Sequence, residues 1–178
     1  MRFAAMLLVL PLAGCVAGGE DDPVAAQRSA EEEVSATSTI GRPAQEFTSS
    51  SVEPAPSTEI KGARVEDPAM ELSYKWQGTS YAPGGGSIVV VAVTNESDAP
   101  MPVDTLSPEL KYNAGGGEMR TAEALSAEEA DVDIIGLDLP LGPGATVNAK
   151  YAFDVSTGNL WDARFTIGNV TFEGNLNN

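Results

Sequence analysis

Acidic side chains gather in one short stretch of the chain, and carboxylate oxygens are ligands that Ca²⁺ prefers. The stretch holds Glu128, Glu129, Asp131, Asp133 and Asp138. In an extended backbone Asp131 and Asp133 would point to the same side, as two ligands of one ion must. The stretch lacks the EF-hand spacing, with Gly at the sixth position and Glu at the twelfth. Two interpretations follow, a Ca²⁺ site at Asp131 and Asp133 or a solvated acidic loop, and the spacing favours the loop.

Histidine, the usual general base near neutral pH, is absent from all 178 residues. Its absence removes the Ser-His-Asp and Cys-His nucleophile systems and the commonest metal ligand. Glycosidases work with two carboxylates and no histidine, so a hydrolase using Glu109 and Glu118 is kept as an alternative. Nothing in their spacing marks these two residues as a pair. We therefore expect a protein that is not an enzyme and that has no cofactor.

The charge of the chain limits its partners. The formal net charge is −16, from 10 Lys and Arg against 26 Asp and Glu. Repulsion argues against nucleic acid and against an anionic lipid surface as the main partner. The glycine runs 84–86 and 115–117 lack the Lys-Ser/Thr of a phosphate-binding loop, so we assign both to turns. No nucleic acid or nucleotide is expected as a ligand.

The N-terminal residues have the pattern of an export signal. Met1-Arg2 is a short positive segment, and residues 3–12 form an apolar run shorter than the about 20 residues that span a bilayer. The run ends on Leu12-Ala13-Gly14-Cys15, and Cys15 is the only cysteine. The alternative is an ordinary secretory signal, which would leave an unpaired thiol in an oxidising compartment.

Residues 12–15 resemble the lipobox of bacterial lipoproteins, in which Leu and two small residues precede a Cys. The resemblance implies that residues 1–14 are a signal peptide and that the sulfur of Cys15 carries a diacylglyceryl group. Two acyl chains are enough for stable anchoring. We therefore expect the chain to be anchored through Cys15 at the extracytoplasmic face of the cell membrane.

Composition changes sharply after Cys15. Residues 15–65 are rich in Ala, Ser, Thr, Glu and Pro, and Phe47 is their only aromatic residue. Such a segment cannot bury enough apolar surface to offset the entropy of ordering. We interpret 15–65 as a disordered tether that holds residues 66–178 away from the membrane.

Strand patterns begin near residue 66. Met70, Leu72, Tyr74 and Trp76 alternate with polar residues, and residues 87–95 (SIVVVAVTN) are apolar on both faces, as in a central strand. Further strands are predicted at 109–112, 146–155, 161–167 and 170–173, whereas 122–130 is helix-like or a single connecting turn. Six or seven short strands separated by turns predict an all-β antiparallel sandwich over 66–178.

Two segments carry a second resemblance, which extends roughly from Met70 to Phe172. The first is a Val-rich strand ending in Asn95, followed by an acidic turn and Pro100-Met101-Pro102-Val103; the second is the corner 141–146 feeding a strand that ends in Phe153-Asp154-Val155. These segments resemble the immunoglobulin-like domain of actinobacterial and other Gram-positive lipoproteins, related in fold to a secreted mycobacterial antigen. The resemblance implies an immunoglobulin-like sandwich that serves as an interaction module, without catalytic residues.

Aromatic residues are the remaining candidates for binding. Alternation assigns Tyr74, Trp76, Tyr151 and Trp161 to core-facing positions. Tyr81, beside Pro83 and the 84–86 glycine run, is the candidate for an exposed contact residue. The function that follows is display of a non-catalytic binding domain towards a protein or envelope partner. The alternatives are a small-ligand or Ca²⁺-binding envelope protein and the carboxylate hydrolase.

Overall fold

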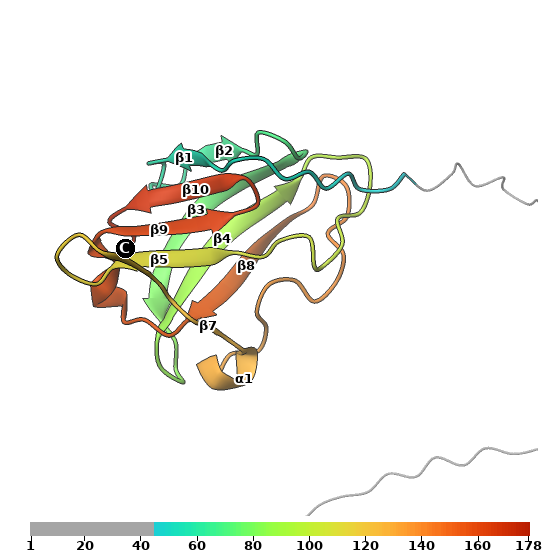
Figure 1. Ribbon diagram of the computed structural model, residues 1–178. Helices are drawn as coiled ribbons and strands as arrows, with labels where there is room; N and C mark the ends of the chain where they lie inside the picture. Colours follow the sequence, from blue (N-terminus) through green and yellow to red (C-terminus); the bar gives the residue numbers. More distant parts are fainter. Residues whose placement is uncertain (1–44) are drawn as a thin grey trace, which may run out of the picture. The chain divides into compact units, whose positions relative to one another are not determined.

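The computed structural model describes residues 45–178, so Cys15, the predicted signal peptide and the first part of the predicted tether lie outside it. The described chain forms two five-stranded sheets that share one core (Figure 1). All strand pairs but one are antiparallel. The prediction of an immunoglobulin-like all-β sandwich is confirmed.

The first sheet has the order β1-β10-β9-β5-β6. Its members are β1 (Ala55–Ser57), β5 (Glu109–Asn113), β6 (Met119–Thr121), β9 (Ala163–Ile167) and β10 (Val170–Gly174). The second sheet has the order β2-β3-β4-β8-β7. It consists of β2 (Arg64–Glu66), β3 (Leu72–Tyr81), β4 (Ser87–Asn95), β7 (Ala124–Leu125) and β8 (Thr146–Phe153).

The β-branched run predicted as a central strand is β4, which pairs with β3 on one side and β8 on the other. Val89, Val91 and Val93 are fully buried between the sheets, and the opposite face of β4 is also covered, because Ile88 belongs to a second small cluster. Burial on both faces explains why this strand has no polar side. Its prediction was correct at both ends.

The core between the sheets is centred on Phe165 of β9. Its ring packs edge-on against Trp76 at 5.9 Å and Phe153 at 6.1 Å between centroids, and Tyr151 lies 6.1 Å away. Phe172 of β10 packs at 5.6 Å from Trp76. Aromatic side chains of both sheets therefore interlock, and Trp76 and Tyr151 are core residues as predicted.

Asn95, the last residue of β4, fixes the turn that follows. Its buried side-chain amide donates to the carbonyls of Ala99 and Leu141, both at 2.8 Å, and its oxygen accepts from the backbone and hydroxyl of Ser97. An antiparallel bridge then joins Met101 to Leu141. The loop that follows β4 is thereby held against the loop that precedes β8.

The segment 122–130, predicted as helix-like or as a single connecting turn, contains one helical turn. Ala124–Leu125 forms β7 at the edge of the second sheet, and only Ala127–Ala130 is helical, as α1. Ser126 caps α1 by accepting from the backbone of Glu129, whose carboxylate in turn accepts from the backbone and hydroxyl of Ser126. The capping box stabilises the start of α1, and Asp131, in the left-handed conformation with φ of 53°, ends the helix after one turn.

The folded domain begins earlier than the predicted boundary at residue 66. Val65 of β2 pairs with Tyr74, and Ala55–Ser57 adds to β10 as a parallel edge strand. Asn169, in the β9–β10 turn, explains why a proline-rich segment is ordered here. Its backbone carbonyl accepts from Ala55, and its side chain accepts from Val52. The assignment of residues 45–65 to a disordered tether was therefore wrong.

Among residues 45–178, no helix has the length and apolar character needed to cross a membrane.

Candidate functional site

An apolar pocket opens at the edge of the second sheet, beside β7 and β8. It has a volume of about 260 Å³ and draws its walls from four separate stretches of the chain. The loop after β4 supplies Val103 and Leu106, β7 supplies Leu125, and the segment before β8 supplies Ile135 and Leu137. Tyr151, Ala152 and Phe153 of β8 complete the lining. We refer to it as the β7–β8 pocket.

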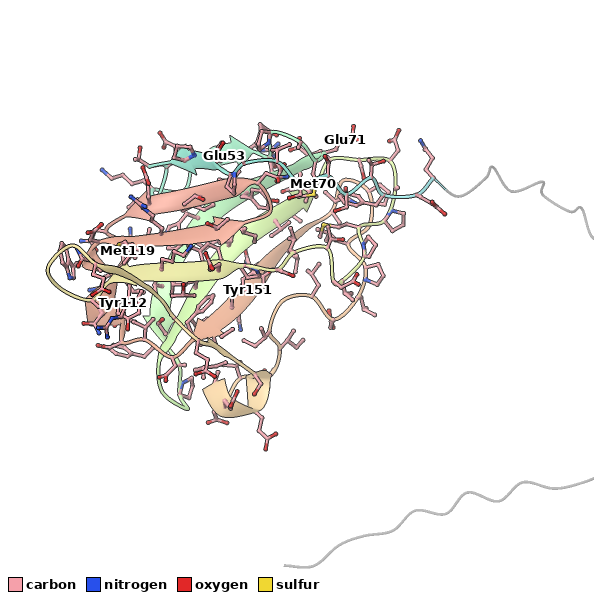
Figure 2. The ribbon with its side chains drawn as sticks, viewed as in Figure 1. Glu53, Met70, Glu71, Tyr112, Met119 and Tyr151 are labelled. Atoms are coloured by element: carbon pink, nitrogen blue, oxygen red, sulfur yellow. The ribbon has the colours of Figure 1, made fainter. Side chains whose placement is uncertain are left out.

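Tyr151 supplies the only polar side chain among the lining residues of this pocket. Figure 2 shows the residue on β8. Burial raises the pKa of Tyr151 to about 12, further above neutral pH than the ordinary tyrosine value, and its protonated hydroxyl can donate a hydrogen bond. The pocket therefore presents one fixed hydrogen-bonding group within an otherwise apolar wall.

Large apolar side chains are exposed on the loops that form the pocket. Val103 is 42% exposed, Ile134 is 44% exposed and Leu139 is 69% exposed. Val103 and Leu139 each lie two residues from the Met101–Leu141 bridge, on the two strands of chain that the bridge joins. Exposed apolar residues beside an apolar pocket are typical of an interaction surface, whereas single scattered ones are not informative.

The same loops are strongly acidic. From residue 121 to residue 149 there is no Lys or Arg, and this stretch contains Glu123, Glu128, Glu129, Asp131, Asp133 and Asp138. Five of these six residues form the acidic stretch that contains the two Ca²⁺ candidates, Asp131 and Asp133. Glu123, Asp133 and Asp138 lie one or two residues from the lining residues Ala124, Ile135 and Leu137, and the other three lie on α1 or at its C-terminal end. The apolar pocket is therefore bordered by negative charge.

The two Ca²⁺ candidates do not have the expected backbone. Asp131 is the C-cap of α1 in the left-handed conformation, with φ of 53°, so Asp131 and Asp133 are not alternate residues of an extended strand. Both side chains are exposed. Within the described part of the chain, no three acidic or cysteine side chains converge on a point that could hold a metal ion.

Glu109 and Glu118 are also not brought together. Glu109 begins β5 and forms an ion pair with Lys111 at 2.6 Å, whereas Glu118 precedes β6 at the far end of the same hairpin. Four to five residues of strand separate them, or about 15 Å. Glycosidase carboxylates lie about 5–9.5 Å apart. The hairpin register therefore gives the hydrolase alternative no support.

Two exposed aromatic residues lie elsewhere on the surface. Tyr81, at the end of β3, is 72% exposed, as predicted. Trp161 is 55% exposed, which contradicts its assignment to the core. It ends the short 3₁₀ helix η1 (Thr157–Trp161), so it does not belong to β9, and the alternation of Ala163, Phe165 and Ile167 does not extend back to it.

The buried carboxylate of Asp67 could be mistaken for a reactive group. It accepts from the backbone of Ala69 and Met70, from the hydroxyl of Tyr74, and from both the backbone and side chain of Asn169, all at 2.8–2.9 Å. Burial alone would raise the pKa of Asp67, but the hydrogen bonds outweigh it and the pKa lies below its usual value. Every contact is structural, and sequence patterns gave no sign of it.

Gly168 shows how closely this network is packed. It adopts φ of 54°, and a Cβ atom there would lie 2.2 Å from the hydroxyl of Tyr74 and 2.7 Å from the carboxylate of Asp67. Only glycine allows the β9–β10 turn to close over the carboxylate. The Asp67 network therefore joins the start of β3 to this turn.

The side chain of Ser87, the first residue of β4, allows a test of the packing at this end of the strand. Its hydroxyl is the only buried side-chain nitrogen or oxygen in residues 45–178 without a hydrogen-bond partner. Because an unpaired buried hydroxyl is unfavourable, Ser87→Ala is expected to raise the unfolding free energy by about 1 kcal/mol in urea denaturation. A loss of stability of that size would instead show that the hydroxyl makes a stabilising hydrogen bond.

Comparison of the chain with protein-family models, with curated proteins and with solved structures gives no match. The lipobox and the immunoglobulin-like segments therefore stay expectations drawn from sequence patterns, and function is argued from the surface of the domain.

Proposed function

We propose that this chain is a lipid-anchored envelope protein whose sandwich domain binds a protein partner through the β7–β8 pocket. The anchor is the predicted lipid on Cys15, and the domain is a binding module without catalysis. The observation that carries the proposal is the combination of a recessed apolar pocket, exposed Val103 and Leu139, and an acidic border.

The size of the pocket favours one side chain as its occupant. Sites for small molecules usually enclose about 300–1,000 Å³. The β7–β8 pocket, at about 260 Å³, lies below this range. Interfaces concentrate their binding energy in a few apolar or aromatic anchors that enter such pockets. A Leu, Phe or Trp of the partner would fill it, and a partner group that accepts a hydrogen bond would meet the Tyr151 hydroxyl.

Charge complementarity describes the rest of the partner. Because residues 121–149 carry six carboxylates and no cation, the segment around the anchor is expected to carry Lys or Arg. Rim charges act mainly on the rate of association and are screened by salt. Association should therefore slow as ionic strength rises, whereas the apolar anchor should keep its contribution.

Val103→Lys tests the pocket without disturbing the core. The residue is 42% exposed and lines the pocket, so a lysine there places a charge at the binding surface at little cost in stability. Val52→Lys is the matched control, because Val52 is 44% exposed on the N-terminal segment. Full-length chains with each change, and the unchanged chain, would be cross-linked in the producing cells and their partners quantified by mass spectrometry.

We expect one partner to be enriched with the unchanged chain and with Val52→Lys, and to fall at least about tenfold with Val103→Lys, which corresponds to 1.4 kcal/mol. A Cys15→Ala chain should also lose it, because that chain would not reside at the membrane. Equal recovery with Val103→Lys and Val52→Lys would reject the pocket as the binding site. Binding of a small apolar molecule, not a protein, to the purified chain would favour the small-ligand alternative.

A further inference from the structure

A second recess lies at the end of the sandwich that carries η1. It has a volume of about 300 Å³ and is formed by Trp161 and Asn159 of η1, by Tyr112 and Asn113 of β5, and by Arg120 of β6, together with the first residues of the β5–β6 loop. We call it the Trp161 hollow. No residue of the β7–β8 pocket takes part in it.

The β5–β6 ladder sets two of its side chains next to each other. Tyr112 is paired with Arg120 on β6 and with Ala163 on β9. Directly opposed residues point to the same face, with Cβ atoms about 4.5–5.5 Å apart. Tyr112 packs partly against the core, so Arg120 lies on the core-facing side of the outermost strand, where it is exposed. Figure 2 shows Tyr112 at this end of β5.

Arg120 has no ionic partner among residues 45–178. The other arginines of this part of the chain, Arg64 and Arg164, both pair with glutamates. The neighbouring carboxylate of Asp162 accepts at 2.8 Å from the side-chain amide of Asn113, whose own oxygen accepts from Gly115. Arg120, which has no ionic partner among the described residues, therefore lines the hollow together with the exposed amide of Asn159 and the exposed ring of Trp161.

These groups describe a ligand with an apolar face and hydroxyl edges. Trp161, 55% exposed, offers a flat surface for C–H groups. Arg120 brings donors with no acceptor, and the side-chain amide of Asn159 brings both a donor and an acceptor. A strong negative field argues against a charged polyanion. We propose that the Trp161 hollow binds an uncharged sugar ring, stacked on Trp161 and hydrogen-bonded by Arg120 and Asn159.

Another account of Arg120 is that an inward-facing charge on an edge strand prevents pairing with a second sheet. That role would not need Trp161 to be exposed or the hollow to exist. If Arg120 has only this role, replacing it changes aggregation, and the unchanged chain does not bind sugars. The proposed site predicts the opposite, so the two roles separate in one titration. The proposal stands apart from the β7–β8 pocket and does not rest on its occupant.

Tryptophan fluorescence of the full-length chain measures this binding directly. The chain has two tryptophans, and Trp76 is 3% exposed in the core, so a ligand in the hollow changes the emission of Trp161 alone. The probes are neutral hexoses, N-acetylhexosamines, pentoses and their β1,4-linked disaccharides. Glucuronic acid serves as the charged comparison.

At least one neutral sugar is expected to give a saturable emission change in the millimolar range or tighter. Trp161→Phe removes most of that signal, so binding to the variants would be followed by calorimetry. Trp161→Ala should weaken binding at least about tenfold and Arg120→Gln severalfold, with the unfolding midpoint unchanged for both. Tyr81→Ala, which removes the other exposed aromatic residue, should bind as the unchanged chain does.

The proposal is overturned if no neutral sugar gives saturable binding, or if Trp161→Ala binds as well as the unchanged chain. It is also overturned if glucuronic acid binds more tightly than its neutral counterpart, since the guanidinium would then select an anion. A failure of the chain to bind sugars would not change the result expected for Val103→Lys, because the two sites are separate.

Discussion

An Asp67→Ala chain is expected to lose about 3–5 kcal/mol of unfolding free energy, the largest effect of any single substitution considered. The change removes the acceptor of five hydrogen bonds from Ala69, Met70, Tyr74 and Asn169. Several of these donors are buried and have no alternative partner of the same strength. Urea denaturation followed by near-ultraviolet circular dichroism measures the loss.

Asp98→Ala is the matched control. Asp98 is an exposed aspartate in the turn after β4, so its removal should change stability by less than about 0.5 kcal/mol. A loss below about 1 kcal/mol for Asp67→Ala would contradict the account, because the network would then contribute no more than one ordinary hydrogen bond.

The stability of the unchanged chain should also depend on pH through this residue. The folded-state pKa of Asp67 lies below its unfolded value, so ionisation stabilises the folded chain at every pH above the unfolded value of about 3.9. This contribution is lost as pH falls through the lower, folded pKa. The stability difference between the unchanged chain and Asp67→Asn should therefore be constant near neutral pH and shrink below about pH 4.

The second large expected effect is that replacing Cys15 changes where the protein is located in the cell. If the sulfur of Cys15 carries a diacylglyceryl group, the two chains contribute about 0.8 kcal/mol for each buried CH₂, which makes anchoring stable. A Cys15→Ala chain should move from the membrane pellet to the soluble fraction, with membrane partitioning lower by on the order of a hundredfold or more. Intact-mass measurement of the unchanged chain should show Cys15 at the N-terminus and the added acyl mass.

Two outcomes would remove the anchor from the account. One is a mature chain whose N-terminus lies at another residue and whose mass shows no acyl group. The other is a Cys15→Ala chain that stays in the membrane pellet after a high-salt wash, since attachment would then depend on another part of the molecule.

Strand positions within 70–173 were largely predictable because their burial is regular. In β8 the apolar residues Ala149, Tyr151 and Phe153 occupy one face, and the sequence alternates accordingly. In β4 both faces are covered, and a continuous apolar run marks it. Local patterns succeed where each residue's environment is set by the strand itself.

The alternation of apolar and polar residues gave a wrong prediction just before β9, where the same pattern continues outside the strand. Trp161 has the correct parity for the inner face of β9, and a large aromatic residue suits that position. The 3₁₀ helix η1 ends on it, so Trp161 faces solvent. Alternation shows which face a residue occupies only within one strand. Residues 157–161 contain no helix signal strong enough to show that the strand does not extend back to Trp161.

The ordered N-terminal segment could not be predicted from its own composition. Pro54 and Pro56 discourage a strand, and tolerance of proline at a sheet edge is the usual exception. What orders the segment is distant in sequence: Asn169 binds Ser50, Val52 and Ala55. Contacts over more than 100 residues leave no local signal.

The binding surface was missed for the same reason. The β7–β8 pocket joins Val103, Leu125, Ile135 and Tyr151, which come from four separate segments. The acidic residues were identified from sequence as a group, but their position beside an apolar pocket follows only from the fold of the 126–141 segment. The sequence composition therefore predicts the negative charge of this surface, but it does not predict the apolar pocket at its centre.

Photo-cross-linking from the pocket is the most direct test of the proposed binding module. A benzoylphenylalanine placed at Val103 of the full-length chain, in the producing cells, is expected to form an adduct with one partner segment. That segment should contain an apolar residue flanked by Lys or Arg, and the same group placed at Val52 should not form the adduct. Adducts of equal yield at both positions, or a contacted segment without apolar and basic residues, would contradict the proposed docking site.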